Sequence, residues 1–230
     1  MRYGSVRSML CRRERTDAQL HIFATSVEGA FPVSHGTISE HAFSESGALP
    51  PAPISLEEFH QMEQAALFTP EDARYLRMSW DVLRNQVDDV LDVWYDFIAA
   101  HPFLLRTFSR RSDGQPDQRY LGAVRQRFAA WIETTAQANY DQQWLNEQYE
   151  IGRRHYRTGK NQTDHVDSVD IVPLRFIAPL VSPLATTLKP FLAQKGHTPD
   201  QVEKMHQAWL KSMLLQVTLW SQPYLKAGDF

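Results

Sequence analysis

The sequence of 230 residues predicts an all-α fold, on three observations. Apolar residues recur at spacings of three and four along most of the chain after residue 53, which is the periodicity of amphipathic helices. Helix start signals stand at three places: Ser55, Thr69-Pro70 and Thr198-Pro199. Since no stretch shows sustained alternation of apolar and polar residues, strands are not needed. We therefore expect six to eight helices with short connections.

The first of these helices are predicted between residues 55 and 100. A capping-box sequence at Ser55 starts a helix over residues 55–67. A longer apolar stripe then begins at Pro70, and its length indicates two consecutive helices with a bend near Asn85. The stripe contains Leu76, Trp80, Leu83, Val87, Val90, Trp94 and Ile98.

After a polar loop, the rest of the chain predicts four more helical segments. Residues 117–137 and 141–158 each carry an apolar stripe. Residues 171–195 are apolar but contain four prolines, which predicts a kinked helix. Residues 199–221 form the last long helix, which is apolar on nearly every side in its second half. Such a helix is buried on two sides, so we expect it to face its own core and a partner subunit.

Two parts of the chain differ in composition. Residues 1–53 have no clear periodicity and end in a stretch rich in Ser, Gly, Pro and His, so we interpret them as a flexible N-terminal arm. The arm begins with several arginines, but polar residues follow them where a secretory signal would have an apolar stretch. Residues 54–230 are expected to form a single domain.

The overall composition limits the class of protein. A net charge of -3 with both signs interspersed argues against a nucleic-acid partner. No run of 18 apolar residues occurs, so we expect no membrane span. Cys11 is the only cysteine, which excludes an intramolecular disulfide and favours a cytoplasmic location.

His155 is the histidine whose position indicates chemistry. It follows Trp144, Gln148 and Ile151 at spacings that place it on the inward face of its helix. Gly152, one turn earlier, is interpreted as leaving room for a flat ligand. Neutral imidazole is a good ligand for iron. The alternative is a core histidine that bonds to a backbone carbonyl, and helix position alone favours that alternative.

Three aromatic residues are further candidates for a binding site. Tyr95 lies one turn after Leu91, so its hydroxyl is a candidate donor to a small ligand, and Trp94 and Phe128 are candidate pocket walls. On spacing alone, core roles are favoured for all three. The arginines that flank His155 are interpreted as solvent-facing charges near a helix C-terminus, although they could reach acidic groups of a cofactor: Arg153, Arg154 and Arg157.

The helical pattern fits either a globin or a helical bundle, but the sequence itself resembles the protoglobins, single-domain haem proteins related to the globin-coupled sensors. The resemblance covers about residues 55–230. It is carried by LDVWYDF at Leu91–Phe97, YLGAVRQRF at Tyr120–Phe128, YEIGRRHYRTGKNQTD at Tyr149–Asp164, KPFLAQKGHTPDQVEKM at Lys189–Met205 and the end of the chain from Ser221.

The resemblance implies an expanded globin fold with an additional N-terminal helix, which residues 55–67 fit. It implies that His155 is the proximal ligand of haem b (iron protoporphyrin IX), with Trp94, Tyr95 and Phe128 on the distal side. Leu180 stands where the family often has a distal aromatic residue, so this chain departs from the family there. A homodimer through the last two long helices is also implied.

The function implied by the resemblance is reversible binding of diatomic gases: dioxygen, carbon monoxide or nitric oxide. Three alternatives remain at this point. The chain could be a haem enzyme, such as a peroxidase, a nitrite reductase or a nitric-oxide dioxygenase. It could be the gas-sensing component of a signalling system, or a helical interaction domain without haem.

Overall fold

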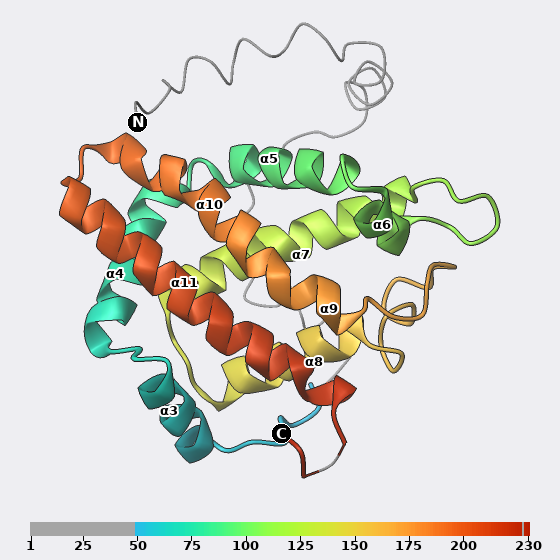
Figure 1. The fold of residues 1–230 in the computed structure, drawn as a ribbon, viewed down its shortest axis with the longest axis horizontal. Coiled ribbons are helices and arrows are strands. Elements are labelled where there is room, and N and C mark those ends of the chain that lie inside the picture. Colours follow the sequence, from blue (N-terminus) through green and yellow to red (C-terminus); the bar gives the residue numbers. More distant parts are fainter. Residues whose placement is uncertain (1–48, 227) are drawn as a thin grey trace, which may run out of the picture. The chain divides into compact units, whose positions relative to one another are not determined.

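A computed structural model describes residues 49–226 and 228–230 (Figure 1). Within these residues the structure is helical, as predicted, and the β-type pairing consists of one isolated bridge between Ser109 and Pro116. Residues 1–48, on which most of the predicted flexible arm falls, lie outside the described part. Just before the first helix, the backbone N–H of Ala52 donates to Asn146 Oδ1 (2.9 Å). The chain is therefore attached to the helical domain before residue 54.

The first two described helices begin where the capping signals predict. Helix α3 (Leu56–Ala65) begins after Ser55, and α4 (Pro70–Leu83) begins after Thr69. Both N-cap residues form complete capping boxes, in which the cap hydroxyl and the carboxylate three residues later accept each other's backbone N–H. The predicted bend near Asn85 is confirmed, because α5 (Val87–Ala99) is a separate helix.

The middle of the chain contains short turns and two long helices. Helix α6 (Pro102–Leu105) and the 3₁₀ turn η1 (Arg106–Phe108) lead into the 109–116 loop. Helix α7 (Gln118–Gln137) follows the prediction closely, but α8 (Gln142–His155) ends before the predicted residue 158. It ends there because Tyr156 takes an extended conformation. His155 is therefore the last residue of its helix.

The proline-rich segment is a helix interrupted by 3₁₀ turns, in agreement with the predicted kinked helix. It consists of α9 (Leu174–Ile177), η2 (Ala178–Leu180), α10 (Val181–Leu192) and η3 (Ala193–Lys195), although Pro183 and Pro190 lie within α10 without ending it. Within the described chain, residues 174–195 are the one segment long and apolar enough to span a membrane by length and composition, a test that core helices of soluble proteins also pass. Here α10 packs against α11, α5 and α4. The absence of a membrane span stays a prediction.

Helix α11 (Pro199–Ser221) is the centre of the packing and leads into η4 (Gln222–Tyr224). It packs against α4, α8 and α10, and Figure 1 shows it running beside α10. Trp209 and Met205 are fully buried on its inner side, whereas Leu214 is 50% exposed on its outer side. The outer side of the second half is thus apolar at Leu214 and polar at Thr218, so the predicted all-round apolar character is only partly seen.

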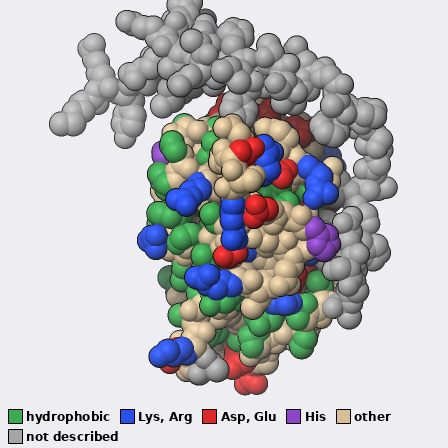
Figure 2. All heavy atoms as spheres, turned by 90° about the vertical axis from the view of Figure 1, so that its right-hand side faces the viewer, with side chains coloured by type: hydrophobic (Ala, Val, Ile, Leu, Met, Phe, Trp, Pro, Cys, Tyr) green, Lys and Arg blue, Asp and Glu red, His purple; other side chains and the backbone are tan. Residues whose placement is uncertain are grey.

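The face shown in Figure 2 carries basic side chains next to acidic ones. Ion pairs of the loops between helices include Arg110–Asp113 (2.7 Å) and Arg111–Asp170. Pairs between exposed groups contribute little to stability, at most about 1 kcal/mol each. This mixture of charges agrees with the net charge of -3, and the absence of a nucleic-acid partner stays a prediction.

Candidate functional site: an apolar cavity beside His155

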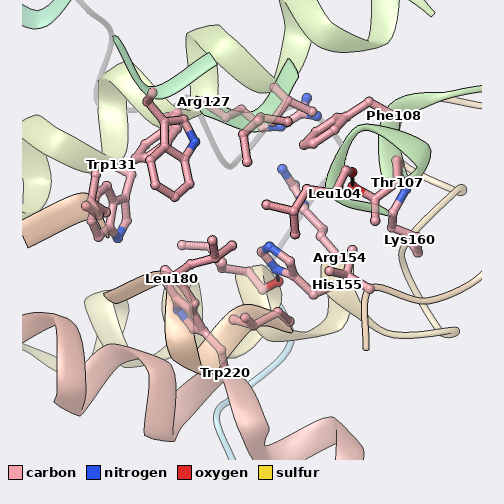
Figure 3. Close-up of a pocket in the computed structure, with 18 of the residues that line it drawn as sticks. Leu104, Thr107, Phe108, Arg127, Trp131, Arg154, His155, Lys160, Leu180 and Trp220 are labelled. Atoms are coloured by element: carbon pink, nitrogen blue, oxygen red, sulfur yellow. Dashed lines mark hydrogen bonds between the residues drawn. The ribbon is translucent and has the colours of Figure 1, made fainter. Parts of the chain in front are cut away.

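A cavity of about 220 Å³ lies between α5, α7, α8, α10 and α11 (Figure 3). Most of its wall is apolar, with polar groups from η1, α7, α8 and the 156–173 loop. The five residues predicted as cofactor-binding all line it: Trp94, Tyr95, Phe128, His155 and Leu180. Helices α5, α7 and α8 and the 3₁₀ turn η2, which are far apart in sequence, therefore bring these side chains to one site.

The ring of His155 is oriented by the backbone of its own helix. Its Nδ1 lies 2.8 Å from the carbonyl oxygen of Ile151. Because a carbonyl can only accept, this contact places the proton on Nδ1 and leaves the lone pair on Nε2. Within residues 49–226 and 228–230, Nε2 has no hydrogen-bond partner. Burial lowers the pKa of His155, which keeps the imidazole neutral and able to bind a metal.

Contacts with the end of α11 hold His155 in place. The indole of Trp220 stacks on the imidazole with ring centroids 5.7 Å apart and planes 12° apart. Trp220 is itself fixed, because its Nε1 donates to Oε1 of the buried Gln148 (2.9 Å). The carbonyl oxygen of His155 accepts from the backbone N–H of Val172 and from the Tyr224 hydroxyl, both at 2.9 Å. The imidazole thus lies on a rigid support.

The structure corrects the interpretation of Gly152. This glycine is outside the cavity and lies against α11, where an added Cβ would meet the carbonyl oxygen of Trp220 at 2.9 Å and its Cα at 3.0 Å. Gly152 is therefore required for the close approach of two helices, and not for the approach of a flat ligand. By bringing α11 close to α8, it places Trp220 beside His155.

The aromatic residues form a continuous wall of the cavity. Trp94 stacks on Phe97 (5.6 Å between centroids) and meets Phe128 edge to face at 5.8 Å. Phe128 in turn contacts Trp131 at 5.2 Å. Such contacts fix the rings and leave little room for water.

Tyr95 brings a polar group into this apolar wall. Its hydroxyl is buried and has no hydrogen-bond partner in the described chain. Burial raises the pKa of Tyr95, so the hydroxyl stays protonated near neutral pH. An unsatisfied buried hydroxyl costs about 1–3 kcal/mol, and such a group in a cavity wall indicates a missing ligand.

One end of the cavity is basic, and two of its cations, Lys160 and Arg127, were not predicted from the sequence. Lys160 is 4% exposed, and its Nζ donates to the carbonyl oxygen of Thr107 (3.0 Å) and to the Tyr120 hydroxyl (2.8 Å). Arg127 forms a two-pronged ion pair with Asp164 (3.0 and 2.6 Å). These residues come from a loop and from α7, and no spacing in the sequence connects them.

The interpretation of the arginines beside His155 was wrong for Arg154. Its side chain is only 14% exposed, lines the cavity and pairs with Glu150 (3.0 Å), one turn earlier in α8. Arg153 pairs with the same carboxylate at 3.0 Å, and Arg157 is exposed. Arg154 is therefore a partly buried cation of the site.

These features define a globin: a helical fold around an apolar cavity with one inward-facing histidine. The chain belongs to the protoglobin family, whose family model, described as Protoglobin, matches residues 55–230. Its fold is similar to that of the globin domain of the globin-coupled sensor of Geobacter sulfurreducens (TM-score 0.57, 16% identity). That match covers 73% of this chain and 97% of the other. No curated protein matches the chain.

Family membership implies a globin-type haem protein that binds gas. The residues present fit that cofactor in three respects. His155 offers a neutral imidazole with its Nε2 free, which suits iron. The walls are apolar and aromatic, as a porphyrin requires, and the basic end suits its two propionates.

Proposed function

We propose that the protein binds haem b, that His155 Nε2 would hold its iron, and that the iron would reversibly bind a diatomic gas (dioxygen, carbon monoxide or nitric oxide). When bound, haem supplies an iron with one coordination position for the gas. The observation that carries the proposal is the orientation of His155: Nδ1 is bonded to the Ile151 carbonyl, and Nε2 has no hydrogen-bond partner among the residues that the structure describes.

Each protein group has a defined task in this function. The Ile151 carbonyl fixes the tautomer of His155 and increases its basicity. Trp220 restricts rotation of the imidazole. Trp94 and Phe128 exclude water from the gas side, and the Tyr95 hydroxyl donates a hydrogen bond to a ligand that gains negative charge. The relative affinity for different gases then depends on Tyr95, together with the space left by Leu180.

Replacement of the ligand tests this assignment. His155→Gly removes the imidazole from the cavity, and free imidazole then has room to bind in its place. We expect apo His155→Gly to bind haem weakly, and millimolar-range imidazole to restore the wild-type absorption spectrum. A variant that keeps the wild-type spectrum without imidazole contradicts the assignment.

We also propose a homodimer through α10 and α11. The support is the apolar outer side of α11, on which Leu214 is half exposed beside the partly buried Leu210 and Val217. A twofold arrangement would bury these residues against their copies. Leu214→Glu tests it: we expect sedimentation to show a dimer for the wild type and a monomer for the variant.

A further inference from the structure

Lys160 is a buried cation that lines the cavity and forms no ion pair with a carboxylate of the described residues. Two of its three N–H groups are used, by the Thr107 carbonyl and the Tyr120 hydroxyl, and Figure 3 shows Lys160 beside Thr107 at one end of the pocket. Throughout the described chain, no carboxylate oxygen lies within 4.0 Å of Nζ. One N–H group is thus left without a hydrogen-bond acceptor, and the carboxylates of Asp164 and Asp170 act on the ammonium only from beyond ion-pair distance. A buried charge without a partner is costly.

The acidic groups near Lys160 are already engaged. Both oxygens of Asp164 accept from Arg127, at 3.0 and 2.6 Å. Asp170, the other carboxylate that acts on Lys160, pairs with Arg111. Glu150 is the partner of the cavity arginine Arg154 and also accepts from Arg153. The two arginines of the cavity wall therefore have carboxylate partners, whereas the lysine has none. The difference between them singles out Lys160 as the site for an anion that enters with a ligand.

The local structure holds Lys160 ready for such an anion. Its ammonium group lies 4.6 Å from the centre of the Tyr120 ring. This contact and the two hydrogen bonds together fix a lysine side chain, which is otherwise flexible. The lysine side chain is therefore ordered before the ligand binds, so binding costs little further side-chain entropy.

We propose that Lys160 binds a propionate of the haem and thereby determines which edge of the porphyrin lies at this end of the cavity. The inference rests on the proposed haem function. A propionate supplies the missing negative charge, and a charge-assisted hydrogen bond to Nζ would use the remaining N–H. Lys160 is then a positioning residue: it fixes the rotation of the porphyrin in its plane, while His155 binds the iron.

The experiment compares haem with its propionate dimethyl ester, which has the same ring and iron but no carboxylates. The rates at which both cofactors transfer to an excess of an apo-globin acceptor are measured for the wild type and Lys160→Met. Lys211→Met is the control, because Lys211 is a partly buried ammonium that also bonds to a backbone carbonyl, at Leu67, but lies outside the cavity.

We expect Lys160→Met to lose haem about ten-fold faster than the wild type or more, from the strength of a hydrogen bond between charged groups. The dimethyl ester should leave both proteins at similar rates, and Lys211→Met should behave like the wild type. Circular dichroism checks the fold. If the methionine variant does not fold, Lys160→Gln keeps a hydrogen-bond donor without the charge, and the same result is expected.

Two outcomes overturn the proposal, and they differ from a failure of the haem function. Equal acceleration for haem and for its ester would show that Lys160 only supports the fold. Unchanged rates with both cofactors would show that another group binds the propionates. A wild-type chain that takes up neither cofactor would remove the proposed function and this inference with it.

Discussion

His155, the last residue of α8, and Trp220, near the end of α11, stack almost parallel, with ring centroids 5.7 Å apart and planes 12° apart. This pair joins the cavity to the packing of the two helices. Because Trp220 is also hydrogen-bonded to Gln148, the imidazole has a fixed neighbour on one face.

Replacing Trp220 should therefore lower both the free energy of unfolding and the affinity for the cofactor. Trp220→Leu removes the ring and leaves the buried Gln148 without this partner, so we expect a loss of about 2–4 kcal/mol in the free energy of unfolding. Trp220→Phe keeps a ring beside His155 and should lose less. Urea denaturation of both variants measures the difference, and equal stabilities would contradict the role of the stack.

Gly152 allows a second prediction with a matched control. Gly152→Ala places a Cβ 2.9 Å from the Trp220 carbonyl oxygen, and both contacts are backbone, so we expect a loss of about 1–3 kcal/mol in stability and faster release of haem. Gly122 lies within α7 with nothing within 4 Å of its added Cβ, so Gly122→Ala should stabilise by up to about 1 kcal/mol. Denaturation curves that show the same sign for both would contradict the close-approach role.

Tyr95 should show opposite effects on stability and on gas binding. In the apo-protein, Tyr95→Phe removes an unsatisfied hydroxyl, so we expect a gain of about 1 kcal/mol in stability. In the haem protein, dioxygen should leave the variant several-fold faster while carbon monoxide changes less, because dioxygen gains more negative charge on binding. Stopped-flow kinetics measures both rates, and an unchanged dioxygen rate would argue against the bond.

Tyr120→Phe is the control for that substitution. The Tyr120 hydroxyl accepts from Lys160, so its removal should destabilise the protein. A stabilised Tyr120→Phe would show that the gain at Tyr95 does not come from its missing partner.

The stability of the apo-protein should depend on pH through Lys160. Burial lowers the pKa of Lys160 from 10.5 to about 8, so between these values the unfolded chain binds more protons than the folded one. Stability from this group therefore rises as pH increases from about 8 to 10.5, by about 1–3 kcal/mol. The difference in unfolding free energy between the wild type and Lys160→Met, measured over this range, should show the rise. A difference independent of pH would contradict the lowered pKa.

Local signals in the sequence predicted the helices well. The capping boxes at Ser55 and Thr69 and the stripe of α4 and α5 depend on neighbours three or four residues apart, and the sequence displays such spacings directly. The end of α8 was harder to predict, because Val172 and Tyr224, which bind the His155 carbonyl, are distant in the chain.

The site was predicted only in part, because some of its residues are brought together by contacts between distant parts of the chain. The five predicted residues line the cavity, and their identification came mainly from the resemblance, since spacing alone favoured core roles. Lys160 was missed because it lies in a loop and its partners, Thr107 and Tyr120, are 53 and 40 residues away. Gly152 was misinterpreted because no pattern shows which element faces a glycine.

The measurement that tests the central claim most directly is an absorption spectrum of the purified protein, ferric and then reduced, with and without carbon monoxide. We predict an intense Soret band that shifts when carbon monoxide is added, because the cavity beside His155 is apolar and its Nε2 is free. If no Soret band is present, even after haem is added to the apo-protein, then the cavity does not bind haem and the account is contradicted.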